Sequence, residues 1–164
     1  MKKFSFTLVM LALALAFGLA FAGCKNEAED EPEVVAPPNG SVWRGIRNGV
    51  RVEYTFYNGT LNARQTISGT FSATYNGVEI ERGTYTVSEG NITVTPTQFY
   101  IPSGDAGFFN TTVGWKTPSE YAQLKKQSGA FTDDEINAAL GPFNSPYSGG
   151  NTMTFNGVVY TLIS

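Results

Sequence analysis

From residue 40 onward the chain alternates apolar and polar positions with a period of two. The clearest segment is 64–75, where Ile67, Phe71 and Tyr75 share one face and threonines and serines occupy the other. This alternation is typical of antiparallel strands with one buried face. We therefore predict strands at 42–47, 50–57, 64–75, 78–88, 91–95 with an extension toward 101, 151–155 and 158–163, with a weaker candidate at 107–114.

Glycine-containing pairs separate several of these segments. Two-residue Asn-Gly turns supply the positive φ angles that a tight hairpin requires. They predict hairpin turns at Asn58–Gly59, Asn76–Gly77 and Asn156–Gly157, and Glu89–Gly90 predicts another. The alternation slips near Arg82–Gly83, which predicts a β-bulge there.

Between Lys116 and Pro146 the period changes to that of short helices. Thr117-Pro118-Ser119-Glu120 predicts a helix start, and this helix should run to about Lys126. Thr132-Asp133-Asp134-Glu135 is a capping-box sequence and predicts a second helix that ends at Gly141. The two helices are expected either to form a lid over a barrel mouth or to cover one end of the barrel.

Together these elements predict an all-β fold, a small antiparallel up-and-down barrel of about eight strands with a short helical insertion near the C-terminus. A barrel of this size either fills its interior with side chains or holds one small ligand. We predict that the barrel domain spans residues 40–164.

The N-terminal segment follows a different pattern. Met1, Lys2 and Lys3 are followed by residues 4–22, which carry no charge, the outline of a secretory signal. The sequence Phe21-Ala22-Gly23-Cys24 resembles the lipobox of bacterial lipoproteins. This resemblance implies a signal peptide at 1–23 and acylation of Cys24, with palmitate-type chains holding the protein on the membrane. The alternative is an uncleaved anchor helix in which Cys24 keeps an unmodified thiol.

Residues 25–39 contain five acidic residues, one lysine and three prolines. Such a segment buries little apolar surface and repels itself, so we expect 24–39 to be a disordered acidic tether that carries the acylated cysteine. An acidic docking tail for a basic partner is the alternative. The remaining domain is nearly neutral.

Composition excludes several classes of chemistry. The 164-residue chain has no histidine, one cysteine and a net charge of -3. Histidine-dependent nucleophilic catalysis and thiolate or imidazole metal sites are therefore excluded, and the scattered cations do not form a nucleic-acid surface. We expect no catalytic residue, no metal and no cofactor, although a hydrolase with two carboxylates that meet only in space stays open.

Aromatic side chains supply the candidate binding residues. All eight tyrosines, both tryptophans and eight of the twelve phenylalanines lie in 40–164. The inward faces of the predicted strands would line a cavity, or fill a dry core, with Tyr54, Phe56, Phe71, Tyr75, Tyr85 and Ile92. Phe108, Phe109 and Trp115 are candidates for the rim of a binding mouth, or else dock the helices.

Three stretches resemble bacterial lipocalin-like (calycin-like) lipoproteins: Gly40-Ser41-Val42-Trp43-Arg44-Gly45, Gly83–Val87 leading into Gly90–Thr95, and Gly150–Tyr160. The resemblance implies a lipid-anchored, non-enzymatic barrel that binds or carries a small hydrophobic or amphipathic ligand in the cell envelope. Lys25 after Cys24 favours the outer membrane. The alternative is a solid barrel that acts as a surface interaction or structural module, such as an inhibitor or adhesin, with a protein partner.

Overall fold

The computed structural model describes residues 34–164, which form a single unit. The predicted signal peptide, the lipidation site Cys24 and most of the predicted tether lie outside the described residues. The last tether positions do not extend away from the domain, because Val34 and Ala36 pack against its core and Pro37 is buried. Residues 34–39, ahead of the predicted boundary at Gly40, therefore pack with the folded unit.

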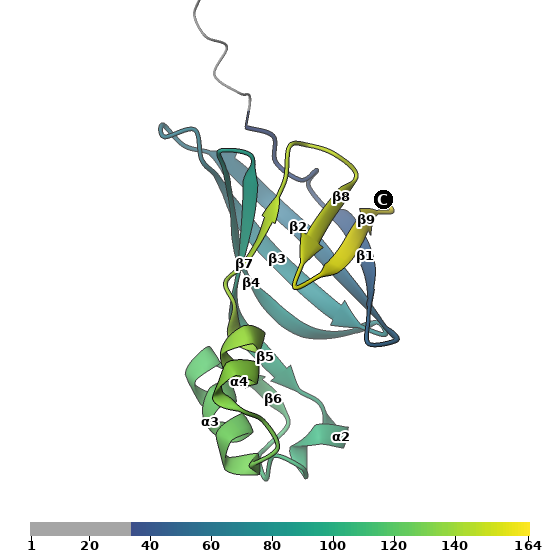
Figure 1. The fold of residues 1–164 in the computed structure, drawn as a ribbon, viewed down its shortest axis with the longest axis vertical. Coiled ribbons are helices and arrows are strands. Elements are labelled where there is room, and N and C mark those ends of the chain that lie inside the picture. The colour runs from purple at the N-terminus through teal and green to yellow at the C-terminus, as the bar shows by residue number, and fades with distance from the viewer. Residues whose placement is uncertain (1–33) are drawn as a thin grey trace, which may run out of the picture. The chain divides into compact units, whose positions relative to one another are not determined.

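The unit is built on one strongly curled, antiparallel sheet of nine strands (Figure 1). The strand order is β6-β5-β4-β3-β2-β1-β9-β8, and β7 pairs with β5 beside β6. The strands are β1 Ser41–Arg47, β2 Val50–Leu61, β3 Ile67–Tyr75, β4 Val78–Ser88, β5 Asn91–Ile101, β6 Gly114–Lys116, β7 Phe143–Pro146, β8 Thr152–Phe155 and β9 Val158–Leu162.

The structure corrects one strand prediction and adds one strand. Residues 107–113 contain no strand. In this segment, pairing with β5 is confined to the short strand β6, from Gly114 to Lys116. A strand that the pattern did not predict, β7, pairs with residues 91–94 of β5. Its four residues include Asn144 and Pro146, so it carries little strand signal and depends on the partner that the fold brings to it.

Four two-residue hairpin turns end in glycine, and one predicted turn, at Asn58–Gly59, does not form. Both residues have positive φ at Asn48–Gly49, Asn76–Gly77, Glu89–Gly90 and Asn156–Gly157, as a two-residue hairpin requires. At Asn58–Gly59 the predicted turn is wrong, because β2 continues to Leu61 and the pair forms a register shift against β3. The chain turns at 62–66 instead, where the side-chain oxygen of Asn62 accepts hydrogen bonds from two backbone amides.

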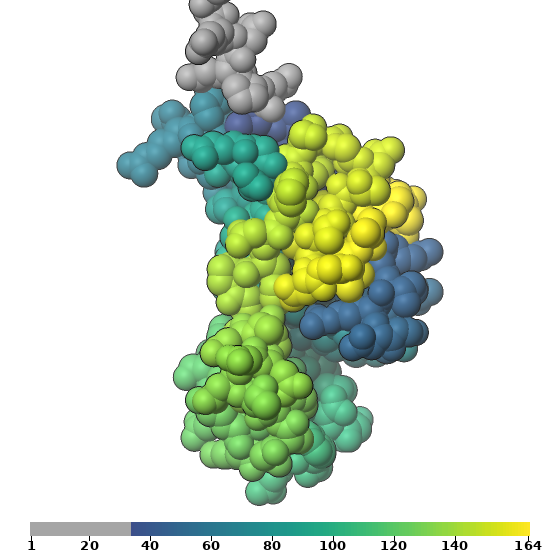
Figure 2. Space-filling view, in the orientation of Figure 1, coloured from purple at the N-terminus to yellow at the C-terminus, as the bar shows by residue number. Residues whose placement is uncertain are grey.

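The edges β7 and β8 lie side by side without a backbone ladder among the described residues (Figure 2). The amide of Thr154 in β8 donates a 2.8 Å hydrogen bond to the hydroxyl oxygen of Ser145 in β7. Ser145 is fully buried at this seam. The predicted barrel is thus observed as a curled sheet whose two edges meet through a side chain.

The helical insertion follows β5, with α2 Ser103–Ala106, α3 Pro118–Ser128 and α4 Asp133–Leu140. Both predicted capping boxes are confirmed, since Thr117 and Glu120 exchange hydrogen bonds at the start of α3, as do Thr132 and Glu135 at the start of α4. The stacked rings of Phe99 and Tyr121, 4.5 Å apart, fasten α3 to β5. Figure 1 shows these helices at the end of the sheet where β5 continues past its neighbours.

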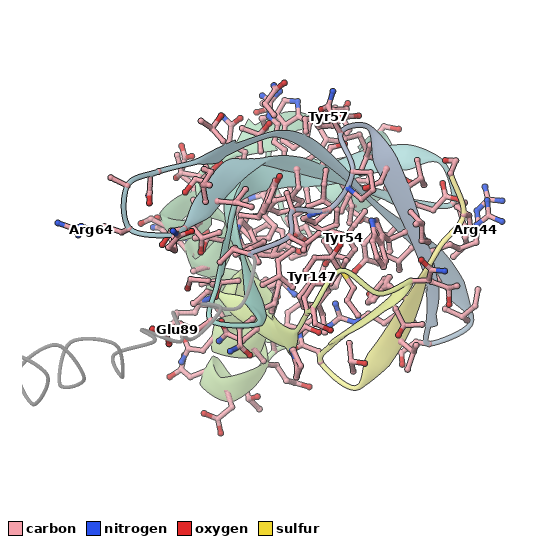
Figure 3. All side chains as sticks on the ribbon, turned by 90° about the horizontal axis from the view of Figure 1, so that it is seen from above. Arg44, Tyr54, Tyr57, Arg64, Glu89 and Tyr147 are labelled. Carbon is pink, nitrogen blue, oxygen red and sulfur yellow. The ribbon has the colours of Figure 1, made fainter. Side chains whose placement is uncertain are left out.

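Aromatic side chains fill the inside of the curl. Tyr54 lies at its centre (Figure 3), and its ring is 5.1–6.3 Å from the rings of Phe56, Phe71, Phe155 and Tyr160. Trp43 is fully buried against Tyr147 and donates its indole N–H to Ser41. This middle part of the sheet is a packed core.

Candidate ligand-binding site

A cavity of about 300 Å³ lies at the end of the sheet that carries the helical insertion. One side of its wall comes from the β1–β2 turn together with the end of β3 and the start of β4. The last residues of β5 form a second side, and α3 and α4 form a third. In Figure 2 the region is the constriction between the sheet and the green helices. The lining residues are Arg47, Asn48, Val50, Tyr75, Ile80, Glu81, Phe99, Tyr100, Tyr121, Lys125 and Ala139.

A β-bulge in β4 places two consecutive side chains on the cavity wall. Ala73 pairs with Glu81 and Thr74 pairs with Glu79, so Ile80 is an extra residue without a partner on β3. Because a bulge interrupts strict alternation, both Ile80 and Glu81 line the cavity. The shift predicted near Arg82–Gly83 also occurs, but there the extra residue is Thr97 of β5.

Glu81 is the one carboxylate in the cavity wall. Its side chain is 5% exposed, and its Oε1 atom has no hydrogen-bond partner among the described residues. Burial raises its pKa to about 8, and the positive charge of Arg47 only partly opposes this shift. Glu81 is therefore mostly protonated at neutral pH and can donate a hydrogen bond.

Arg47 ends β1 and brings a guanidinium to the same wall. It donates a 3.3 Å hydrogen bond to the hydroxyl of Tyr75, the last residue of β3. Arg44 and Arg51, by contrast, face outward and both approach the carboxylate of Glu53. Arg47 has no such partner among the ion pairs of residues 34–164, so its charge is available to the cavity.

Lys125 of α3 adds a second cation. It is 8% exposed, and its ammonium lies 3.8 Å from the ring centre of Phe131 and 5.2 Å from that of Tyr121. Desolvation, followed by the repulsion of Arg47, lowers its pKa. The aromatic rings hold the ammonium in place without neutralising it.

Phenol groups complete the polar lining. Burial raises the pKa of Tyr121 to about 12, with a smaller contribution from the charge of Glu81. Burial also raises the pKa of Tyr75, the last residue of β3. Both phenols are neutral at physiological pH and can donate or accept hydrogen bonds.

One of the six predicted cavity residues, Tyr75, lies on the wall of this cavity. Their predicted inward orientation is confirmed for the other five, which are buried in the packed core: Tyr54, Phe56, Phe71, Tyr85 and Ile92. The rings of Phe56 and Tyr85 meet edge to face with centres 5.1 Å apart. These five side chains contact one another and none lines the 300 Å³ cavity.

The three predicted rim residues occupy different environments, and none of them lines this cavity. Phe108 is 57% exposed, whereas its neighbour Phe109 is buried beside Phe131. Trp115 is half-buried under the guanidinium of Arg82, which lies 4.1 Å from the ring centre.

Sequence reasoning considered Glu81 only as a possible catalytic acid and placed none of the charged members of the site in a cavity. Arg47, Glu81 and Lys125 are far apart in the sequence, and the fold brings them together. The sequence did contain a signal for Glu81. Tyr85 faces inward, and every second residue of a strand shares one face, so Gly83 and Glu81 are expected to face inward as well. For Lys125 no periodic signal existed, since α3 has only a weak apolar face.

Residues 34–164 contain no group of three or more His, Cys, Asp or Glu side chains placed to hold a metal ion. Within the same range, no helix is both long and apolar enough to cross a membrane. Searches against protein-family models, curated proteins and solved structures find no match.

Proposed function

We propose that this chain is an exported, lipid-anchored barrel protein of the cell envelope that binds or carries a small amphipathic ligand. The observation that carries the proposal is the 300 Å³ cavity, whose lining combines apolar side chains with converging charged and phenolic groups. Its volume is at the lower end of the range of small-molecule sites, and its mixture of apolar and polar lining is typical of them. The ligand would bind at the end of the curl rather than in its packed middle.

The remaining parts of the proposal come from the sequence. Acylation of Cys24 would hold the protein on the membrane, with the outer membrane favoured by Lys25.

The contact between Ser145 and Thr154 supports closure of the sheet into a complete barrel. A binding role is favoured over hydrolysis because the cavity wall contains a single carboxylate, and glycoside-hydrolase chemistry uses two.

Filling the cavity tests the proposal. Ala139 of α4 lines it, and the adjacent Ala138 is exposed. We expect Ala139→Trp to weaken binding of a neutral fluorescent alkyl probe at least tenfold, and Ala138→Trp to leave it unchanged. Failure of the unmodified protein to bind the probe, or equal binding by both variants, would rule out this site.

A second function is favoured by a different observation. The aromatic core is solid, and Phe108 and Val113 are exposed on the segment after β5, at 57% and 49%. This combination fits a surface module that contacts another protein. Crosslinking in cells should then yield a defined adduct that Phe108→Ser removes and Leu61→Ser, at an equally exposed apolar position at the end of β2, retains. An adduct insensitive to Phe108→Ser would dismiss this alternative.

A further inference from the structure

The cavity holds more positive than negative charge near neutral pH. Arg47 and Lys125 line it, and neither forms an ion pair within residues 34–164. The ion pairs of this part of the chain are all elsewhere, between Arg44 or Arg51 and Glu53, and between Lys126 and Asp133. One buried and one partly buried cation without an ion-pair partner among these residues favour an anionic ligand.

Glu81 supplies the second observation. It is buried, its Oε1 atom has no partner among the described residues, and it shares the cavity wall with Arg47. A buried carboxyl group without a hydrogen-bond partner costs free energy that a ligand can recover by accepting a hydrogen bond from it.

We propose, as a refinement that rests on the ligand-binding function, that the cavity takes a medium-chain amphipathic carboxylic acid, whose carboxylate accepts hydrogen bonds from Arg47 and from the carboxyl of Glu81. A guanidinium presents parallel N–H donors that match the two oxygens of a carboxylate. Val50, Ile80 and Phe99 provide the apolar wall for the start of the alkyl chain.

Other ligand classes fit these residues less well. An alkylammonium ion would meet the like charges of Arg47 and Lys125. A neutral alcohol would leave the guanidinium without a counterion and would gain only a neutral hydrogen bond, which is weaker than a charge-assisted one. The cavity therefore selects by the charge of the head group.

The state of Glu81 adds a pH dependence. With a pKa of about 8, Glu81 is protonated at pH 7 and donates a hydrogen bond to the ligand carboxylate, and it repels that carboxylate once it ionises. The charged and titratable groups that act on this site are Arg47 from β1, Tyr54 from β2, Tyr75 from β3, Tyr121 and Lys125 from α3, and Tyr160 from β9, together with Asp105 from α2, which acts on Tyr121, and Glu135 from α4, which acts on Lys125. The buried tyrosines and Arg47 have raised pKa values, so the ionisation of Glu81, at a pKa of about 8, is the change that the substitution Glu81→Gln isolates.

The test compares decanoate, decanol and decyltrimethylammonium, three probes built on a ten-carbon chain with different head groups. Binding to the full-length chain in zwitterionic lipid nanodiscs is measured by calorimetry, with empty nanodiscs as the reference. At pH 7 we expect decanoate to bind at least tenfold more tightly than either of the others. Between pH 7 and pH 9 decanoate binding should weaken about tenfold, and Glu81→Gln, which keeps a donor but cannot ionise, should remove this loss.

Matched variants on one strand locate the head group. Arg47→Gln should weaken decanoate binding at least tenfold and leave decanol binding unchanged, and Arg47→Lys should restore part of the loss. Arg44→Gln, three residues earlier on the outer face, should change neither. Equal binding of decanoate and decanol overturns the carboxylate inference and leaves the ligand-binding function intact. Failure of all three probes to bind overturns both, and an equal loss for decanoate and decanol in Arg47→Gln shows that the effect is structural.

Discussion

Ile80 and Glu81 are neighbours in sequence, yet both side chains line the same cavity, because Ile80 is the extra residue of a β-bulge in β4. In a regular strand one of the two would face solvent. The bulge therefore places an apolar side chain and a carboxyl group next to each other on the cavity wall. The binding hypothesis depends on this local irregularity and on the helices that cover the same end.

The first prediction concerns stability and pH. The pKa of Glu81 is raised to about 8 in the folded state, whereas an unfolded glutamate titrates near 4.5. Between these values the folded state binds more protons than the unfolded state, so the free energy of unfolding must fall as pH rises. The slope can reach about 1.4 kcal/mol per pH unit. Chemical unfolding of the full chain from pH 4 to 9 should show this decline.

Glu81→Gln should flatten the decline between pH 5 and 8 and make the protein more stable at pH 7. Glu79→Gln is the matched control, because Glu79 is two residues earlier on the same strand and exposed. A pH profile that Glu81→Gln leaves unchanged would show that this carboxyl is ionised in the folded protein.

The second prediction concerns the aromatic core. Phe56 is fully buried among Tyr54, Phe71 and Tyr85, so Phe56→Ala should lower the free energy of unfolding by about 3–5 kcal/mol. Tyr57, the next residue on β2, points outward (Figure 3) and is 39% exposed. Tyr57→Ala should change stability by less than about 1 kcal/mol. Similar losses in the two variants would mean that the faces of β2 are assigned wrongly.

The third prediction concerns the close approach of β4 and β5. A methyl group at Gly83 would collide with the carbonyl oxygen of Thr95 and come within 2.9 Å of a ring carbon of Phe71. Gly83→Ala should therefore destabilise the protein by about 1–3 kcal/mol, as overpacking does. At Gly104 in α2 an added methyl group meets no atom within 4 Å, and Gly104→Ala should be neutral or slightly stabilising. Thermal unfolding of both variants measures the contrast, and a neutral Gly83→Ala would contradict the register of β4 and β5.

The fourth prediction concerns the seam between β7 and β8. Ser145→Ala removes the acceptor for the amide of Thr154 and leaves that donor without its partner, at a cost of about 1–3 kcal/mol. Hydrogen exchange at Thr154 should accelerate while exchange in β3 and β4 stays slow. Asn144→Ala, at the exposed neighbouring position, should leave exchange at Thr154 unchanged. Unchanged protection in Ser145→Ala would show that this bond does not hold the two edges together.

Much of the fold could be predicted from local pattern, because alternation records which side of a strand is buried. Tyr54, Phe56 and Phe71 face the core as their period-two spacing indicates. The capping boxes at Thr117 and Thr132 also act within three residues and are readable from sequence alone. These local rules were right for the buried strand faces and for both helix starts.

The site was harder to predict because it depends on contacts between distant segments. Tyr75 was identified as an inward residue, but its partner Arg47 comes from a different strand and has no motif. The same explanation holds for β7, whose pairing with β5 joins residues about 50 positions apart. The pair Asn58–Gly59 shows the converse, since a strong local turn signal was overridden when β2 continued through it.

The most direct test of the account is to map where an alkyl ligand binds. A decanoate analogue with a photoreactive diazirine in its chain is crosslinked to the full-length protein, and the modified residues are identified by mass spectrometry. The account predicts labels on the cavity wall, at Tyr75, Ile80, Phe99 or Tyr121, and their loss with excess decanoate or in Ala139→Trp. Labels confined to Tyr54 and Phe155 in the core or to Val34–Pro38 at the other end of the sheet, or labels that excess decanoate does not displace, would contradict it.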